Sequence, residues 1–167
     1  MKKMISIILS VLMMVSAFCV ATVSADTTNE KSGDSLNCKW SFNDKNGTLT
    51  ISGNGKMADY SYDVDDPDGY DDYDDVSKVT PNTPWKNYVT KIKTVVVENG
   101  VKNIGSLAFM NCTNLATVKI AGSVSSVGFL SFANCRKLTN ISLPKNLTSI
   151  QSFAFMNCNK LSKVTIP

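Results

Sequence analysis

Residues 101–120 read VKNIGSLAFMNCTNLATVKI, and the residue types of this stretch return along the chain at intervals of 23 residues. The repeat runs from residue 92 to residue 166 without an insertion. Its apolar positions form columns: Ile104, Val127 and Ile150; Phe109, Phe132 and Phe155; Cys112, Cys135 and Cys158; Leu115, Leu138 and Leu161; Val95, Val118, Ile141 and Val164; Val97, Ile120, Leu143 and Ile166. A fixed period of this length is typical of a stacked solenoid, in which each unit contacts only its neighbours.

The end of each unit has the pattern of a short strand. In residues 117–120, TVKI, apolar and polar side chains alternate, so the valine and isoleucine are expected to point inward. The copies at residues 92–97, 138–143 and 161–166 are predicted to lie beside this strand at roughly 4.8 Å, the spacing of hydrogen-bonded strands. The repeats therefore predict parallel strands on one face.

The other side of each unit is predicted to be helical. Residues 106–112, SLAFMNC, place leucine, phenylalanine and cysteine near helical spacing. The segment is too short for a free-standing helix, so we expect one or two helical turns. The fold class predicted from the repeats is an α/β solenoid over residues 81–167.

The repeat resembles a known family. Residues 101–120 carry the pattern Val-x-x-Ile-Gly-x-x-Ala-Phe-x-x-Cys-x-x-Leu-x-x-Val-x-Ile, which is similar to the BspA-type leucine-rich repeat of bacterial and some protist surface proteins. Residues 40–57 and the pair Pro84-Trp85 are similar to the N-terminal region that often precedes such repeats. The resemblance covers residues 38–167. It implies a secreted or surface-displayed interaction module, often an adhesin, and no catalytic residues.

The amino-terminal segment has the pattern of a secretory signal. Residues 1–25 combine a positive start, an apolar stretch and the small-residue site Val-Ser-Ala, which predicts a signal peptide cleaved before Asp26. A retained membrane anchor is the alternative. Residues 26–35 are polar and aperiodic, and we expect a short linker there. After cleavage no stable membrane span is expected, and the protein should be secreted or held at the cell surface.

Residues 36–58 are predicted to form a β-hairpin that caps the first repeat. Two alternating stretches, CKWSF and TLTIS, flank the turn Asn46-Gly47. The open end of a solenoid exposes a flat apolar face and an unpaired strand edge. The side chains expected to cover it are Trp40, Phe42, Leu49 and Ile51.

Residues 59–80 are predicted to be an acidic, solvated loop. Nine Asp and four Tyr occur within residues 59–75. Clustered carboxylates can bind calcium, and Asp66 and Asp68 fit an EF-hand loop if Gly69 occupies its turn position. Val64 would then occupy the first ligand position, so these two residues are weak calcium candidates. A calcium-responsive module therefore stays open as an alternative.

Charge divides the chain by position. Residues 26–80 hold five Lys against thirteen acidic groups, a net charge of −8, whereas residues 81–167 hold ten Lys and Arg against Glu98 alone, a net charge of +9. A basic repeat region can attract acidic glycans, cell-wall polymers or the acidic loop itself. The chain has no nucleic-acid-binding motif, so we expect no nucleic-acid partner.

The cysteines are interpreted as core residues. Cys112, Cys135 and Cys158 share one column, and Val89 occupies the position 23 residues before Cys112. Where valine fits, cysteine acts as a small buried hydrophobe. One strained disulfide between neighbouring units stays open, because an oxidising compartment favours disulfides. No Cys-x-x-Cys pair is present, so we expect neither a zinc site nor another cofactor.

Residue types also argue against an enzyme. The chain has no histidine, which excludes Ser-His-Asp and Cys-His catalysis. Carboxylate-pair hydrolysis needs two acids at a fixed separation, and the aspartates are concentrated in one unstructured run. We therefore expect no catalytic residues.

The outward side chains of the strands are the candidate ligand-binding site. Solenoids use such rigidly spaced rows to bind extended ligands. The row comprises Thr94, Val96, Thr117, Lys119, Asn140, Ser142, Lys163 and Thr165. We expect an extracellular protein or glycan as the ligand. The alternative function is a non-catalytic display or targeting module of a longer extracellular protein. Separately, the uncovered apolar residues at the carboxyl end predict self-association.

Overall fold

The computed structural model describes residues 30–62 and 73–166. The expected signal peptide, residues 1–25, and the calcium candidates Asp66 and Asp68 lie outside the described residues. The described elements are β1 (Glu30–Ser35), β2 (Cys38–Asn43), β3 (Thr48–Gly53), η1 (Tyr73–Lys78), η2 (Lys86–Tyr88), β4 (Thr94–Val97), β5 (Asn103–Ile104), β6 (Thr117–Ile120), β7 (Ser126–Val127), β8 (Asn140–Ser142), β9 (Ser149–Ile150) and β10 (Lys163–Thr165).

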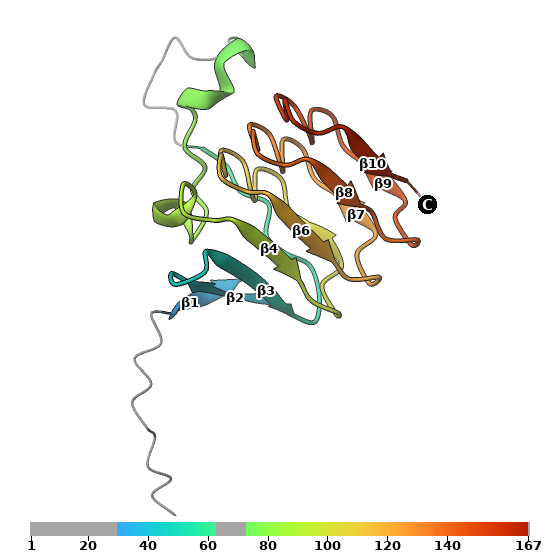
Figure 1. The fold of residues 1–167 in the computed structure, drawn as a ribbon. Helices are drawn as coiled ribbons and strands as arrows, with labels where there is room; N and C mark the ends of the chain where they lie inside the picture. Colours follow the sequence, from blue (N-terminus) through green and yellow to red (C-terminus); the bar gives the residue numbers. More distant parts are fainter. Residues whose placement is uncertain (1–29, 63–72, 167) are drawn as a thin grey trace, which may run out of the picture.

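The repeats form a β-solenoid of about three turns, which we call rungs (Figure 1). Each rung contributes a strand of three or four residues to one face and a two-residue strand to the other. On the first face β4 pairs in parallel with β6, and β8 with β10, while β5, β7 and β9 form one parallel sheet. The 23-residue columns set the register, because Val95 lies opposite Val118 and Ile104 opposite Val127.

The first face, which we call the strand face, is divided between β6 and β8. These strands lie side by side but belong to different sheets, one with the order β1-β2-β3-β4-β6 and one containing β10 and β8. The prediction that all the long strands pair in one run is wrong at this step. The rungs stay together here because β7 pairs with both β5 and β9, so a continuous ladder on the strand face is not required.

A file of aromatic rings runs through the core and confirms the stacking of the phenylalanine column. The ring centroids of Phe109 and Phe132 are 5.3 Å apart, and those of Phe132 and Phe155 are 5.5 Å apart. Trp85 extends the file, with its centroid 6.0 Å from that of Phe109. Its indole Nε1 donates a hydrogen bond of 2.8 Å to the Ala108 carbonyl. These separations are typical of favourable ring pairs.

The outer side of each rung is a layer of tight turns, where the predicted helical turns are not confirmed. The amides of Leu107, Phe109 and Asn111 donate to carbonyls of the next rung at 2.8, 2.8 and 2.9 Å, whereas the intervening amides close turns within their own rung. Leu107 and Asn111 have φ angles of 57° and 61°, a left-handed conformation that interrupts an α-helix. Because alternate amides bond to the next rung, the segment cannot form a run of i to i−4 bonds.

The hairpin residues extend the sheet of the first rung. β2 and β3 are antiparallel, and β3 pairs in parallel with β4. β1 lies antiparallel to β2, so the expectation of a linker as far as Ser35 is wrong for residues 30–35. A Cβ at Gly33 would lie 2.7 Å from the indole nitrogen of Trp40. Because glycine has no side chain, the indole of Trp40 fits over Gly33 on the neighbouring strand. The alternation of residue types along the sequence does not reveal this contact.

The second half of the predicted acidic loop is ordered against the turn layer. Residues 73–78 form η1, and Val76 is buried in a cluster with Leu107, Met110 and Leu130. The side-chain amide of Asn111 donates hydrogen bonds to the carbonyls of Val76 and Val79. The prediction of a solvated loop over residues 59–80 is therefore wrong for residues 73–78. The reason is that the apolar side chain of Val76 packs against the turn layer.

The phenylalanine file supports a prediction about stability. Phe132 is fully buried between two rings, whereas Phe153 is 54% exposed. We expect Phe132→Ala to lower the free energy of unfolding by about 3–5 kcal/mol, as for other buried aromatic residues. Phe153→Ala should lower it by at most about 1.5 kcal/mol, the value of one aromatic pair. Equilibrium denaturation in urea measures both, and equal losses would contradict the proposed role of the file.

The close packing of the rungs supports a second prediction. A Cβ at Gly128 would lie 2.5 Å from the backbone nitrogen of Ser106 in the previous rung, whereas a Cβ at Gly122 would meet no atom within 4 Å. We expect Gly128→Ala to destabilise the protein by about 1–3 kcal/mol through overpacking. Gly122→Ala should leave the stability unchanged or raise it slightly. Thermal unfolding of the two variants provides the comparison, and a Gly128→Ala protein as stable as the parent would disprove this packing.

Candidate functional site

The predicted ligand-binding residues lie on the strand face. In register, Thr94 lies opposite Thr117 and Val96 opposite Lys119. The row is more accessible toward the carboxyl end. The residues on β6, β8 and β10 are exposed, whereas those on β4 are half-buried. The exposed members are Thr117, Lys119, Asn140, Ser142, Lys163 and Thr165.

The same row continues onto the hairpin strands, which sequence reasoning missed. Thr48 and Thr50 of β3 lie opposite Thr94 and Val96, and Ser41 of β2 lies opposite Thr50. The alternation of TLTIS already indicated that the threonines point outward. The sequence did not reveal that β3 pairs in parallel with β4, and without that pairing the hairpin could not be placed on this face.

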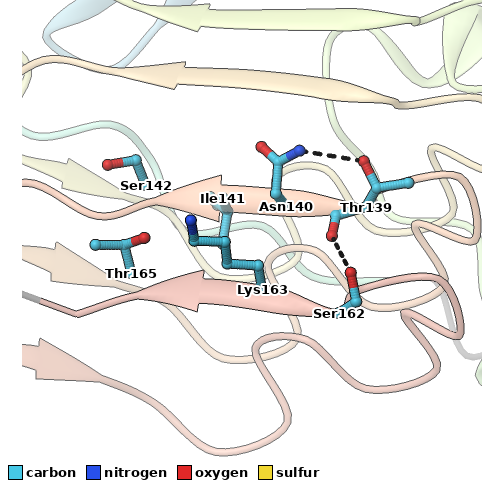
Figure 2. A pocket seen from close by; sticks show the side chains of 7 residues that line it. All are labelled: Thr139, Asn140, Ile141, Ser142, Ser162, Lys163 and Thr165. Carbon is cyan, nitrogen blue, oxygen red and sulfur yellow. Dashed lines mark hydrogen bonds between the residues drawn. The ribbon is translucent and has the colours of Figure 1, made fainter.

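A hollow of about 520 Å³ lies at the carboxyl end of the strand face. Figure 2 shows Asn140 and Ser142 of β8 beside Lys163 and Thr165 of β10. The hydroxyl of Ser162 donates a hydrogen bond of 3.3 Å to the Thr139 carbonyl, and the side-chain amide of Asn140 donates one of 3.3 Å to the Thr139 hydroxyl. The hollow therefore presents hydroxyl, amide and ammonium groups to solvent.

The structure brings together half of the predicted row. The four members on β8 and β10 line the hollow, whereas the members on β4 and β6 lie beyond the break in the sheet and do not contribute to it. Among the side chains that the structure describes, residues 31–62 and 76–166, Lys163 has no acidic partner.

A second hollow, of about 250 Å³, lies on the side of β5, β7 and β9. Its walls include Met57, Asp59 and Asn103, and these groups already bind neighbouring backbone. Asp59 accepts a hydrogen bond of 2.7 Å from the Ser106 amide, and the Asn103 side chain accepts one of 2.9 Å from the Met57 amide. The residues of this hollow therefore connect the segment after the hairpin to the first rung of the repeats.

The cysteine column lies in the core, as expected from its alignment with Val89. Cys112, Cys135 and Cys158 are buried free thiols. The thiols of Cys135 and Cys158 donate to the Phe109 and Phe132 carbonyls at 3.3 and 3.1 Å. Burial raises the pKa of Cys112 and Cys135 well above the ordinary value of 9.0, because a thiolate is poorly solvated there. The thiols of Cys112 and Cys135 are therefore poor nucleophiles at neutral pH. The pKa of Cys158 is instead lowered, first by its side-chain hydrogen bond with Cys135.

Two kinds of feature, metal-binding clusters and membrane-crossing helices, are absent from the described residues. Within residues 30–62 and 73–166, no cluster of three or more His, Cys, Asp or Glu side chains could hold a metal ion. Over the same residues, no helix has the length and apolar character needed to cross a bilayer.

Comparison with known families gives one match. The family model described as BspA type leucine rich repeat region (6 copies) matches residues 85–167. No curated protein sequence matches the chain significantly.

Solved structures of bacterial leucine-rich repeat proteins are similar to this chain. A leucine-rich repeat protein from Eubacterium ventriosum aligns with a TM-score of 0.52 at 20% identity, covering 83% of this chain and 40% of that protein. One from Bacteroides capillosus has a TM-score of 0.46 at 21% identity, with 81% and 98% covered. A leucine rich cell surface protein from Faecalibacterium prausnitzii has a TM-score of 0.39 at 22% identity, with 82% and 43% covered. The first of these shows a shared fold.

The buried thiols predict how stability depends on pH. Both thiols stay protonated in the native state, whereas in the unfolded chain they ionise near pH 9. The unfolded state then binds fewer protons, so the free energy of unfolding should fall as pH rises above 9, by about 1.4 kcal/mol per pH unit for each thiol. Urea denaturation between pH 8 and pH 10 measures this slope. The variant Cys112→Val/Cys135→Val should have a shallower slope than the parent, with the remainder coming from groups such as Cys38 and Tyr60, whose pKa burial also raises. An unchanged slope would show that the two thiols do not cause it.

Proposed function

The chain belongs to the BspA-type leucine-rich repeat family through residues 85–167, and on this premise we propose that it is a secreted or cell-surface interaction module. Its ligand is a protein or a glycan bound on the strand face. The family is one of repeat regions, and no enzymatic family is indicated. The proposed role is therefore binding without catalysis, in agreement with the absence of histidine.

The observation that carries this proposal is the exposed polar row on the strand face. Strand pairing fixes the backbone of these residues, so binding a ligand there orders little additional protein. Solenoids present extended binding surfaces in this way. The row ends in the hollow lined by β8 and β10, where a ligand group can contact Asn140, Ser142, Lys163 and Thr165 together.

The proposal also assigns a role to the hairpin, as a cap of the solenoid, and a location to the protein, outside the cell. Trp40, Phe42, Leu49 and Ile51 are buried in the same core cluster as Val95 and Val97, which supports a capping role for the hairpin. The signal-peptide pattern of residues 1–25 supports secretion.

A specific observation favours self-association as a second role. The last rung exposes Ile150, Phe153, Val164 and Ile166, with 40–68% of each side chain accessible. Exposed large apolar side chains that lie on one end of a molecule often mark a contact surface. A second copy of the chain is one partner that would cover them.

Reversing charge on the strand face tests the proposed site. We expect the variant Lys119→Glu/Lys163→Glu to weaken binding by roughly tenfold or more, equivalent to about 1.4 kcal/mol. Two cations become anions on the proposed surface, so the effect should be large for any ligand that contacts them. A screen of the purified protein against extracellular proteins and glycans identifies the ligands, and surface plasmon resonance then gives Kd.

The matched control is Lys102→Glu/Lys145→Glu, which makes the same change in net charge at exposed positions outside the strands. This control should bind as the parent does. If both double variants lose binding equally, or neither does, the site is not on the strand face.

A further inference from the structure

A group of cations lies at the amino ends of β8 and β10, the two strands that line the hollow. Lys163 begins β10, and Arg136, Lys137 and Lys160 lie in the exposed loops that precede β8 and β10. We call these four residues the basic cluster. Lys137 and Lys160 are 23 residues apart and so occupy equivalent positions in adjacent rungs, which a strand ladder separates by roughly 4.8 Å. The two loops are held in register, because the amide of Ser162 donates a hydrogen bond of 3.0 Å to the Thr139 carbonyl.

Within the described residues the basic cluster has no acidic partner. At the equivalent position of the first rung, Lys91 pairs with Asp44 at 3.2 Å. In the second rung the position is Asn114, whose amide binds the Thr90 carbonyl at 2.6 Å. Glu98, the single acidic residue after residue 80, follows β4 at the opposite end of the strands. At this repeat position, the cation of the first rung is therefore paired with an acid, whereas Lys137 and Lys160 of the later rungs have no acidic partner among the described residues.

The side chains of the hollow are suited to a hydrated ligand. Six of its seven lining residues are Ser, Thr, Asn or Lys, and none is aromatic. Protein interfaces instead enrich Tyr, Trp and Met and are depleted of Lys and Ser, and their strongest contacts come from aromatic residues and Arg. The hollow thus offers hydrogen bonds for hydroxyl-rich ligands and little apolar surface for a protein side chain.

Charge then distinguishes between kinds of glycan. A neutral glycan would gain only solvent-exposed hydrogen bonds here, and each contributes little net because water competes for the same groups. An anionic glycan gains the electrostatic attraction of the basic cluster in addition. The equivalent positions of Lys137 and Lys160 in adjacent rungs also suit a linear chain that carries regularly spaced negative charges.

We propose that the hollow and the basic cluster bind a linear anionic polysaccharide, whose carboxylate or sulfate groups contact the cluster while its hydroxyl groups contact β8 and β10. This assignment rests on the proposed function and narrows its ligand class. It also adds Arg136, Lys137 and Lys160 to the strand-face residues predicted from sequence.

The test compares two neutralising variants. Lys137→Gln/Lys160→Gln removes charge from the basic cluster, and Lys102→Gln/Lys145→Gln removes the same charge from exposed loops at the other end of the strands. Binding is measured by isothermal titration calorimetry in 50 mM salt with heparin, polygalacturonate, neutral dextran and poly-glutamate. Heparin and polygalacturonate distinguish sulfate from carboxylate recognition, and poly-glutamate represents an acidic polypeptide.

The parent protein should bind at least one of the two anionic polysaccharides, with affinity that falls as salt screens the charges. The Lys137→Gln/Lys160→Gln variant should bind about fivefold or more weakly, whereas the Lys102→Gln/Lys145→Gln variant should change less than about twofold. Equal losses in both variants would mean attraction to net charge alone and would overturn the proposal. Poly-glutamate bound as tightly as the polysaccharides would overturn it in favour of an acidic polypeptide.

The proposal and the broader function fail separately. If neither anionic polysaccharide binds, while a ligand from the protein and glycan screen remains sensitive to Lys119→Glu/Lys163→Glu, the anionic polysaccharide is excluded and the strand-face site stands. If no screened ligand is sensitive to that variant, the strand-face site itself is excluded.

Discussion

The stacking of equivalent apolar side chains between rungs is the constraint on which the structure depends. A single 23-residue unit exposes two flat apolar faces, and its buried groups cannot offset the cost of ordering its backbone. Phe109 and Phe132 illustrate the solution, because each ring is fully buried between the rings of the neighbouring rungs. This requirement fixes the period, and the period in turn places the strands, turns and surface side chains of the repeats.

The turn layer shows how the backbone satisfies its hydrogen bonds within this stack. Alternate amides of residues 105–112 bond to the next rung, and the left-handed residues Leu107 and Asn111 turn the chain so that this is geometrically possible. Contacts between rungs on the other sides of the solenoid also explain why the structure holds together although β6 and β8 are not paired. The small sheet of β5, β7 and β9, the turn layer and the apolar core all cross that boundary. A rigid scaffold therefore persists beneath a surface that divides into two parts.

That division separates two parts of the strand face that differ in accessibility and in their charged residues. The part formed by β2, β3, β4 and β6 presents mainly half-buried polar residues, and its Lys91 is paired with Asp44. The part formed by β8 and β10 presents the hollow, and the basic cluster lies at the amino ends of these strands. The strand-face row becomes more accessible along the solenoid, and the anionic polysaccharide that we propose would bind near its carboxyl end.

The sequence by itself determined the repeat, its register and the residues that stack, because a strict period requires equivalent side chains to occupy equivalent places. It also indicated which strand residues point outward, since side chains alternate along a strand. Tertiary structure decided what depends on contacts between segments without a shared period: β1 beside β2, Val76 of η1 on the turn layer, and turns in place of helical segments. It also decided that only β8 and β10 contribute to the hollow, because the break after β6 arises from strand pairing and leaves no trace in the 23-residue pattern.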